Sequence, residues 1–355
     1  MPTTRATRQR STTKKQNKRP PAGRSCSAIV VSTGCPSGIG PEVSVAAAVK
    51  FKLAPTVLVG DRETIAAAAE LRGIDPKRFR AYDPDRPCSK RVLYVLHVEP
   101  KLTARDRRPG SPSRTAGAAQ LAYIDRAYDL VRALPGAALV TGPVSKAVIA
   151  GSGAAQASGF RGHTEWLQAR DRAPSSVMCF AAQQLVTSLV TTHLPLAKVA
   201  RALTPEAVAS AIVGLVELLD SLGPRPLRVA VCSLNPHAGE GELLGSEEAR
   251  AILPGITAAK RRIGRGVELV GPIGAETAYR KALAKQYDGV VAMYHDQATI
   301  PMKLIAFGDA VNVTMGLQVV RTSVDHGTGY DIAWQGVADE NGMLSAMNLG
   351  ARLVG

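Results

Sequence analysis

The sequence predicts an α/β fold with a largely parallel sheet, for three reasons. Short apolar runs rich in Val, Leu and Ile alternate with longer segments in which apolar residues recur at helical spacing. Many of the short runs end in glycine, proline or a polar residue, as strands do where they lead into the helices that cover a sheet. The hydrophobic content of 45% is that of a globular protein, and no apolar run reaches the roughly 18 residues that would cross a bilayer.

The first predicted unit is a buried strand over residues 27–33, followed by a glycine-rich turn and a helix start at residues 34–42. Pro41 and Glu42 suit the first turn of a helix, because a proline there sacrifices no hydrogen bond and an acidic residue complements the helix dipole. Free amides at such a turn can bind an anion. The glycine spacing matches no nucleotide-binding fingerprint, so a purely structural turn is an equal alternative.

The following elements repeat the order of strand, turn and helix. We predict strands at 55–61, 91–98, 137–141, 184–192, 227–235 and 288–294, with helices at 62–72, 115–134, 204–222 and 246–262. The segments 81–90 and 104–114 are rich in proline and arginine and are predicted to be loops. The length of 355 residues allows one large or two medium domains.

Three of the later strands end at a histidine, namely His193, His237 and His295. Because the carboxyl ends of parallel strands open onto the same crevice, we expect the three imidazoles to lie together. Three neutral imidazoles form a catalytic metal site that leaves coordination positions open. A single histidine at a strand end is usually structural, so the prediction depends on the repetition. Asp296 follows His295 and could orient that ligand or act as a general acid or base.

The last third of the chain also contains a candidate anion site. Lys303 and Arg321 supply two positive charges and Asn312 adds a neutral amide. This set suits a phosphate or a carboxylate on a small substrate. The alternative is that the two cations form ordinary surface salt bridges with Asp309 and Asp325.

Most of the basic excess lies at the N-terminus. Residues 1–24 carry eight Lys or Arg and no acid, which leaves +7 of the net charge of +15 for the rest of the chain. Such a segment cannot bury an apolar face, so we expect a disordered tail. The tail could be a dispensable extension, an organelle address or a weak nucleic-acid contact, and we prefer the first of these. Five scattered cysteines without CxxC spacing and the lack of an apolar leader favour a cytoplasmic protein without membrane contact.

Seven motifs occur in one order along the chain. They are GxPSGIGPE from Gly34, TGPVxK from Thr141, GHTE from Gly162, THLPL from Thr192, NPHAGEG from Asn235, YHDQ from Tyr294 and RTSVDHGT from Arg321. Together they resemble the 4-hydroxythreonine-4-phosphate dehydrogenase family of pyridoxal phosphate biosynthesis. The resemblance covers the chain from about residue 27 to its end.

The resemblance implies a two-domain α/β/α fold similar to isocitrate and isopropylmalate dehydrogenases, with the active site in the interdomain cleft. It places residues 25–145 and 308–355 in one domain and residues 146–307 in the other, and it implies a homodimer whose two subunits share each site. The implied metal ligands are His193, His237 and His295. The implied substrate-binding residues are His163, Thr164, Lys303, Asn312 and Arg321.

The implied activity is an oxidation by NAD or NADP of the 3-hydroxyl of 4-phosphooxy-L-threonine. Loss of carbon dioxide then produces 3-amino-2-oxopropyl phosphate, which enters pyridoxine 5′-phosphate biosynthesis. The family requires a divalent metal, with zinc, cobalt or magnesium as candidates. The chain departs from the family pattern at Cys35, where an acidic residue is usual, and after Thr328. A paralogous dehydrogenase of another phosphorylated hydroxy acid, such as erythronate 4-phosphate, is therefore the alternative.

The segment from His326 onward is similar to the adenosine-binding loop of the isopropylmalate dehydrogenases. This similarity implies cofactor contacts by His326, Gly327, Asp331 and Asn341. Asp331 would accept a hydrogen bond from the ribose 2′-hydroxyl and repel a 2′-phosphate, which favours NAD over NADP.

Overall fold

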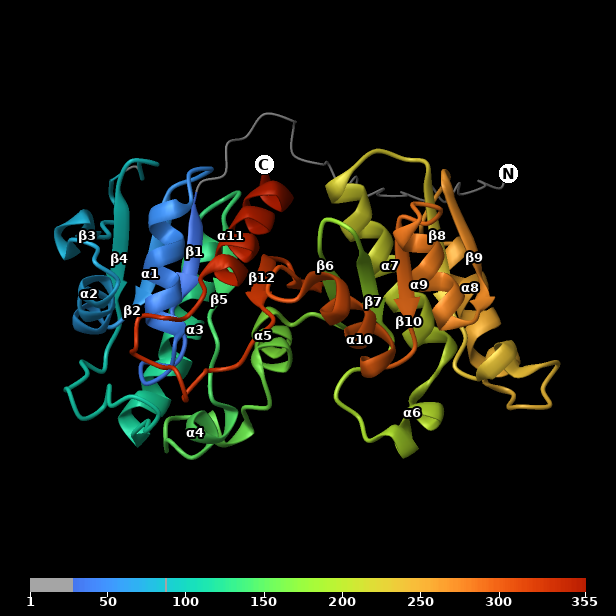
Figure 1. The fold of residues 1–355 in the computed structure, drawn as a ribbon, viewed down its shortest axis with the longest axis horizontal. Helices are drawn as coiled ribbons and strands as arrows, with labels where there is room; N and C mark the ends of the chain where they lie inside the picture. The colour runs from blue at the N-terminus through green and yellow to red at the C-terminus, as the bar shows by residue number, and fades with distance from the viewer. Residues whose placement is uncertain (1–27, 87) are drawn as a thin grey trace, which may run out of the picture.

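The computed structural model describes residues 28–86 and 88–355, so the predicted N-terminal tail lies outside the described residues. The chain forms one 12-stranded sheet with helices on both faces (Figure 1). The strand order is β3-β4-β2-β1-β5-β12-β11-β6-β7-β10-β8-β9. The predicted α/β/α fold class is confirmed.

Six mutually parallel strands and the helices on them make up what we call the first lobe. Its strands are β1 (Ile29–Ser32), β2 (Thr56–Gly60), β3 (Phe79–Ala81), β4 (Leu93–His97), β5 (Ala138–Thr141) and β12 (Val320–Val324). Its helices are α1 (Gly40–Lys50), α2 (Arg62–Leu71), α3 (Arg114–Ala133), α4 (Lys146–Ala150), α5 (His163–Asp171) and α11 (Asn341–Val354), with 3-10 turns η1 (Pro76–Arg78) and η2 (Ala157–Gly159).

The second lobe contains a second parallel block. Its strands are β7 (Val186–Leu189), β8 (Leu227–Cys232), β9 (Val267–Ile273) and β10 (Gly289–Ala292). Its helices are α6 (Leu196–Ala202), α7 (Pro205–Leu222), α8 (Leu253–Lys260), α9 (Ala275–Leu283) and α10 (His295–Ala306), with short helical turns η3 (Pro236–Gly239) and η4 (Glu248–Ile252).

Two central strands, β6 (Val177–Ala181) and β11 (Val311–Met315), join the lobes. β11 is antiparallel to both β12 and β6, and β6 is antiparallel to β7. Three antiparallel pairings in succession reverse the strand direction, so each lobe is parallel internally but the two blocks run in opposite directions. The strands that precede the three predicted metal-binding histidines all belong to the second lobe, and their carboxyl ends therefore share one edge.

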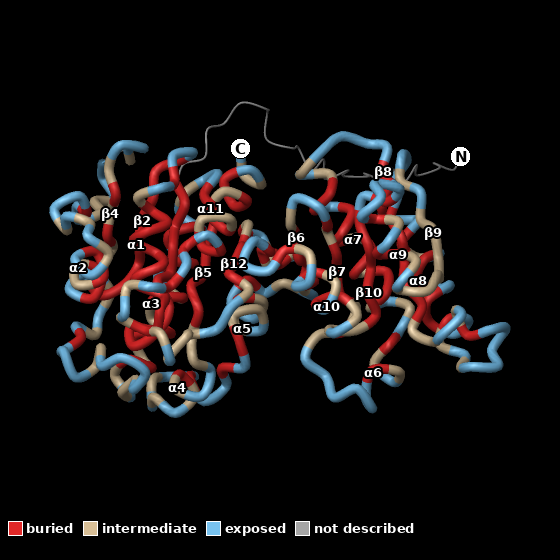
Figure 2. Tube along the Cα trace, viewed as in Figure 1, coloured by how far each residue is buried: buried red, intermediate tan, exposed pale blue. Residues whose placement is uncertain are grey.

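The core follows the sheet on both faces, and the exposed residues lie in the outer loops and helix surfaces (Figure 2). One apolar cluster continues across both lobes beneath α1, α2, α7, α8 and α11. On the opposite face α3 and α5 cover the first lobe, and α9 and α10 cover the second.

The packing also bears on the predicted domain division, which stays a prediction. Residues after position 145 were assigned to the second domain. Ile149, Phe160 and Leu167 nevertheless pack in the same apolar cluster as Leu121 and Leu139 of the first lobe. We therefore favour a boundary closer to the start of β6.

No single helix among the described residues has both the length and the apolar character needed to cross a membrane. α6 and α7 pass that test only when they are joined across a bend of 94°.

Candidate active site

A cavity of about 370 Å³ lies between the lobes and contains most of the predicted site residues. It is lined by Lys146, Gly162, His163, Thr164, Glu165, Met178, His193, Lys303, Asn312, Arg321, Ser323, Val324, Asp325, His326 and Gly327. All five predicted substrate-binding residues are in this set, together with one predicted metal ligand and two predicted cofactor contacts. The fold thus brings together residues as far apart in the chain as Lys146 and Gly327.

Arg321 is a buried positive charge without a carboxylate partner. Its side chain is only 3% exposed, and among the described residues no acid lies within ion-pair distance of it. The guanidinium donates to the hydroxyls of Thr314 at 2.7 Å and Thr141 at 2.8 Å, while its Nε is buried without a partner. Burial lowers the pKa of Arg321 to about 10. Because an unpaired buried charge is costly, this geometry favours an anionic ligand.

The start of α5 adds further anion-binding groups to the same place. Gly162 precedes the helix, and no side chain caps its first N–H groups. Uncapped amides and the helix dipole favour negative charge. The Nε2 atom of His163 is buried without a partner. Burial, and then the charges of Arg321 and Lys146, hold the pKa of His163 well below its usual value, so the ring is neutral.

Asn312 completes a set of three unsatisfied polar groups in the cavity. It lies on β11 opposite Ser323 of β12, and its Oδ1 is buried without a hydrogen-bond partner. Buried polar atoms in folded proteins almost always find a partner. Unsatisfied atoms on His163, Asn312 and Arg321 around one cavity therefore indicate where a polar ligand binds.

Two of the predicted metal ligands are neighbours. The ring centroids of His193 and His295 are 5.5 Å apart. Nδ1 of His295 lies 2.8 Å from a carboxylate oxygen of Asp296, which leaves Nε2 free to bind a metal. Burial, and then the charges of Lys146 and His295, lower the pKa of His193, so that the neutral form needed for coordination is favoured.

The third predicted ligand, His237, stands apart from this pair. It is exposed and lies in η3 with a left-handed φ of 52°. Within the described part of a single chain, no three His, Cys, Asp or Glu side chains are grouped to hold a metal ion. Two imidazoles, one of them oriented by a carboxylate, fit part of a metal site, and one chain by itself does not complete it.

Lys303 and Asp325 form the other charged feature of the cavity. Nζ of Lys303 is 3.8 Å from a carboxylate oxygen of Asp325, which is an ion pair but is longer than a hydrogen bond. The alternative of a salt bridge is thus realised for Lys303, although not for Arg321. Burial raises the pKa of Asp325 above its usual value, and the charge of the neighbouring Lys303 offsets only part of this rise.

The predicted cofactor contacts separate into two groups. His326 and Gly327 line the cavity. Asn341 begins α11 and donates to Asp339 at 3.3 Å. A Cβ atom on the next residue, Gly342, would lie 3.6 Å from the ring of His326, so Asn341 is near that ring. Asp331 is exposed and does not line the cavity.

The two departures from the family pattern contact each other. Sγ of Cys35 lies 3.4 Å from the hydroxyl of Tyr330. Burial raises the pKa of the Cys35 thiol, which therefore stays protonated. Tyr330 belongs to the loop that follows β12. Glu42 anchors this loop, because its carboxylate accepts hydrogen bonds from the backbone N–H groups of Trp334 at 2.8 Å and Gly336 at 3.2 Å. Cys35, the unusual residue of the glycine-rich turn, is thus in contact with Tyr330, an unusual residue of the loop after β12.

Sequence reasoning gave no role to the threonines that hold Arg321. Thr314 is two residues after Asn312 on β11, so strand alternation would have placed both on one face. Thr141 ends β5 within a motif that was recognised, but nothing in the sequence indicated its contact with Arg321. Glu165 and Asp325 line the cavity and also received no role.

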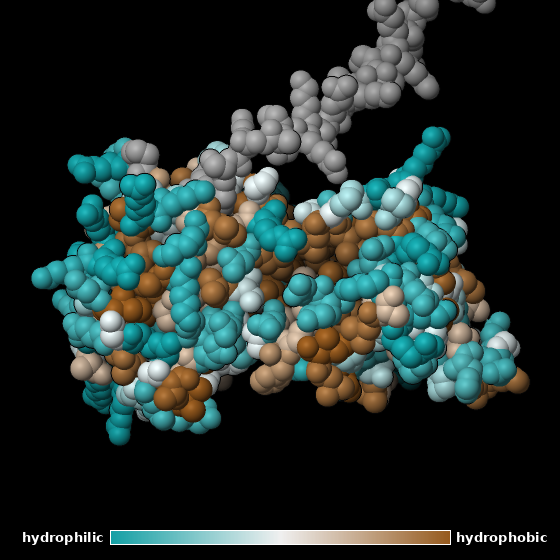
Figure 3. Space-filling view, turned by 45° about the horizontal axis from the view of Figure 1, so that its top comes forward, coloured by the Kyte–Doolittle hydropathy of each residue, from teal (hydrophilic) through white to brown (hydrophobic). Residues whose placement is uncertain are grey.

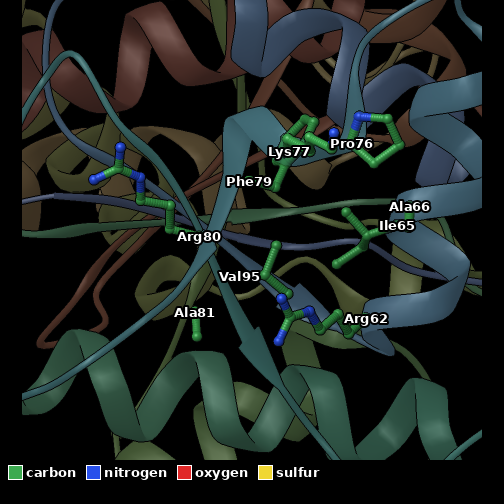
Figure 4. A pocket seen from close by; sticks show the side chains of 9 residues that line it. All are labelled: Arg62, Ile65, Ala66, Pro76, Lys77, Phe79, Arg80, Ala81 and Val95. Carbon is green, nitrogen blue, oxygen red and sulfur yellow. The ribbon is translucent and has the colours of Figure 1, made fainter.

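Two larger concavities, of about 510 and 810 Å³, contain none of the predicted site residues. Figure 4 shows the smaller one, whose lining includes the basic residues Arg62, Lys77 and Arg80 and the apolar residues Ile65, Phe79 and Val95. It has no unsatisfied buried polar atom among its lining residues. The cavity between the lobes is therefore the better candidate for an active site.

Comparisons with known proteins show which family this chain is similar to. Residues 52–350 match the family model for pyridoxal phosphate biosynthetic protein PdxA. A 4-hydroxythreonine-4-phosphate dehydrogenase from Aromatoleum aromaticum is 40% identical over 92% of this chain and 96% of its own length. The crystal structure of a 4-hydroxythreonine-4-phosphate dehydrogenase from Klebsiella pneumoniae has a TM-score of 0.79 at 33% identity and covers 93% of this chain and 100% of its own.

A second activity also occurs on this fold. The crystal structure of a terephthalate 1,2-cis-dihydrodiol dehydrogenase from Burkholderia xenovorans has a TM-score of 0.65 at 30% identity. It covers 92% of this chain and 97% of its own.

Proposed function

Because this chain belongs to the family of pyridoxal phosphate biosynthetic protein PdxA, we propose that it is a 4-hydroxythreonine-4-phosphate dehydrogenase. It oxidises the 3-hydroxyl of 4-phosphooxy-L-threonine with a nicotinamide cofactor, and the resulting β-keto acid loses carbon dioxide. The product is 3-amino-2-oxopropyl phosphate, an intermediate of pyridoxine 5′-phosphate biosynthesis.

The observation that carries this proposal is the unpaired Arg321. A phosphate would supply the missing counter-charge and accept from Nε of Arg321 and from the free amides at the start of α5. His163 and Thr164 would contact the same group, and Asn312 would contact a polar group farther along the substrate. These interactions fix the carbon skeleton against the cofactor, and such positioning accounts for a large part of enzymatic rate enhancement.

The metal would be held by His193 and His295, with His237 as the third ligand. A divalent ion there supplies Lewis acidity toward the hydroxyl that is oxidised and toward the carbonyl that forms from it. Asp296 fits the orienting role better than acid–base catalysis, since its carboxylate already holds Nδ1 of His295. Zinc and cobalt suit imidazole ligands better than magnesium does.

A homodimer is the arrangement that completes this site. Exposed apolar residues follow each of the three histidines: Leu196 after His193, Leu243 after His237, and Ile300 and Leu304 after His295. Their exposed fractions are 73%, 83%, 58% and 82% respectively. Apolar side chains reach the surface of the second lobe in Figure 3. Such surfaces favour association, and we propose that a second copy covers them and brings its His237 to the cavity.

The cofactor site is the part of the cavity beside His326 and Gly327, with Asn341 close by. NAD is favoured over NADP, because the acidic Asp331 of this loop would repel a 2′-phosphate. Asp331 does not line the cavity, which is consistent with contact to the distant ribose of the cofactor and not to the substrate.

The direct test is NADH production across a panel of phosphorylated hydroxy acids, with and without a chelator. We expect turnover of 4-phosphooxy-L-threonine, abolished by the chelator and restored by zinc or cobalt. Preferential turnover of erythronate 4-phosphate would instead support the paralogous alternative. Turnover unaffected by the chelator would contradict the metal site.

A further inference from the structure

Asp61 is a buried carboxylate that does not line the cavity between the lobes. It follows β2 and caps α2, because its Oδ2 accepts from the backbone N–H of Thr64 at 2.8 Å and from the Thr64 hydroxyl at 2.7 Å. Its other oxygen, Oδ1, is buried without a hydrogen-bond partner. A buried charge of this kind is costly unless a cation faces it.

Arg107 supplies that cation. Its Nη1 lies 3.7 Å from Oδ2 of Asp61 and 3.7 Å from a carboxylate oxygen of Glu63, and no other Lys or Arg of the described residues lies within 4 Å of Asp61. Nδ1 of His97 is 3.8 Å from Asp61, but it accepts from the backbone N–H of Arg62 at 3.2 Å and so carries no proton. The charge of Asp61 is therefore balanced by Arg107.

Arg107 belongs to residues 103–113, which we call the strap. Asp106 ties the two ends of the strap together. Its carboxylate accepts from the backbone N–H and the hydroxyl of Thr103 at 3.0 and 2.6 Å, and from the hydroxyl of Ser113 at 2.6 Å. Because the strap is closed on itself in this way, a fastening at Arg107 holds the whole segment.

The strap contacts the glycine-rich turn of residues 34–40. The hydroxyl of Ser37 donates to the backbone carbonyl of Asp106 at 3.1 Å. The backbone N–H of Gly110 donates to the carbonyl of Ser37 at 2.9 Å. Strap and turn thus hold each other through one residue, Ser37, which is fully buried.

The turn and the strap both support the loop after β12. The backbone N–H of Ile39, in the turn, donates to the carbonyl of Thr328 at 2.9 Å. A Cβ atom on Gly110, in the strap, would lie 3.2 Å from the carbonyl oxygen of Tyr330. The two residues before Thr328 line the cavity, whereas no residue of the strap does.

We propose that Arg107 is a positioning residue for the cofactor. By fastening the strap to Asp61, it holds the glycine-rich turn, and through the turn the loop after β12, in the arrangement that binds NAD. This inference rests on the proposed function, which puts the cofactor beside His326 and Gly327. Arg107 acts through Ser37 and not by contact with the cofactor, so its loss should affect the cofactor far more than the phosphorylated substrate.

The experiment measures the two ligands separately on the metal-loaded protein. NADH fluorescence gives Kd for the cofactor, and steady-state kinetics gives KM for NAD and for 4-phosphooxy-L-threonine. Arg107→Met should raise Kd for NADH and KM for NAD at least about fivefold, and should change KM for the phosphorylated substrate less than about twofold. Hydrogen exchange at the Ile39 amide, which joins the turn to the loop, should accelerate while exchange at Val30 in β1 does not.

Arg107→Met leaves Asp61 buried without a cation, so a second variant guards against failure to fold. Asp61→Asn/Arg107→Met lacks both charges, and neutral groups are tolerated in place of a buried ion pair. The asparagine still accepts from Thr64, but the strap is unfastened. The same rise in Kd for NADH is therefore expected. Arg107→Lys keeps the charge and should retain most of the affinity for NADH.

Arg105→Met and Arg108→Met are matched controls. Each removes one positive charge from an exposed position of the same strap. Both should leave Kd for NADH unchanged. A rise as large as that in Arg107→Met would mean that charges of the strap attract the anionic cofactor from a distance, and it would overturn the inference.

The remaining outcomes separate the inference from the proposed function. If the double variant binds NADH as the wild type does and exchange at Ile39 is unchanged, the inference is overturned while the proposed function stands. An equal rise in KM for NAD and for the phosphorylated substrate also overturns it, since Arg107 would then stabilise the lobe as a whole. A wild type that neither binds NADH nor turns over a phosphorylated hydroxy acid would overturn both.

Discussion

Arg321 on β12 and Thr314 on β11 are partners across the antiparallel ladder, and the guanidinium of Arg321 donates to the Thr314 hydroxyl at 2.7 Å. A second hydroxyl, from Thr141, holds the other terminal nitrogen at 2.8 Å. Neutral partners orient the guanidinium without cancelling its charge. The buried cation is therefore held in place and remains available to an anion.

Replacing Arg321 by methionine should mainly weaken binding of the phosphorylated substrate. The variant loses the charge and the donors but keeps most of the apolar volume. A charge-assisted hydrogen bond contributes about 1.5–3 kcal/mol, so KM for the substrate should rise at least about tenfold while KM for NAD changes little. Steady-state kinetics with both substrates varied provides the measurement. An equal rise in both KM values would contradict the phosphate role.

Complementation between inactive variants should reveal the shared site. His237→Ala removes a proposed metal ligand, and Arg321→Met removes the phosphate contact. His237→Ala should be inactive by itself, and it should also lose bound metal while its circular dichroism remains native. Arg321→Met should have little activity at substrate concentrations well below its raised KM, so the complementation is measured there. If His237 serves the cavity of the partner, mixed dimers contain one intact site, and mixing the variants after dissociation should restore part of the activity. No recovery from mixed dimers of confirmed composition would place His237 in its own subunit's site or outside both.

Asp296→Asn should weaken metal binding without removing a ligand. The carboxylate orients His295 through Nδ1 at 2.8 Å, and loss of such an outer partner typically lowers metal affinity about 10–100-fold. Competition with a chromophoric chelator measures the affinity directly. Asp339→Asn, an exposed replacement of the same kind, serves as the control. Full metal affinity with lost turnover would instead support a role in proton transfer.

His163 should make stability depend on pH in a defined direction. Burial holds its pKa in the folded protein well below the usual value of 6.5. A depressed pKa means that its contribution is present above pH 6.5 and is lost as the pH falls, because the unfolded state then binds the proton. Relative to His163→Gln, the wild type should lose about 1.4 kcal/mol of unfolding free energy per pH unit below 6.5.

Urea unfolding of the two metal-free proteins between pH 7.5 and 5.5 tests this slope. Other histidines are common to both proteins, so the difference isolates position 163. Parallel stability profiles would mean that His163 can be protonated in the folded state.

Glu42→Ala should destabilise the loop after β12. The change leaves the backbone N–H groups of Trp334 and Gly336 without their acceptor, and one unsatisfied buried donor costs about 1–3 kcal/mol. Hydrogen exchange at these two amides should accelerate before exchange in the sheet does. The Glu42→Gln variant keeps one acceptor oxygen and should be affected less. Unchanged exchange at both amides would show that Glu42 is not the anchor.

Strand and helix order could be read from the sequence because apolar periodicity is a local property. A few consecutive apolar residues are enough to identify a buried strand, and this holds for β1, β2, β5, β8 and β10. The edge strand β3 did not, since only Phe79 among its three residues is buried and no alternation is visible. The reversal of strand direction at β11 was also hidden, because a strand has the same apolar pattern whichever way it pairs.

The sequence by itself determined which chemistry is available: three histidines after strands of one block, two cations, an amide and the motifs that identify the family. Tertiary structure decided which of these groups meet, because that depends on the register of β11 against β12 and on the packing of α5 beside them. It placed Arg321 in a buried cavity without a carboxylate, brought His193 to His295, and left His237 outside one chain's cluster. Burial and counter-charge are properties of the surroundings in space, which no single stretch of residues contains.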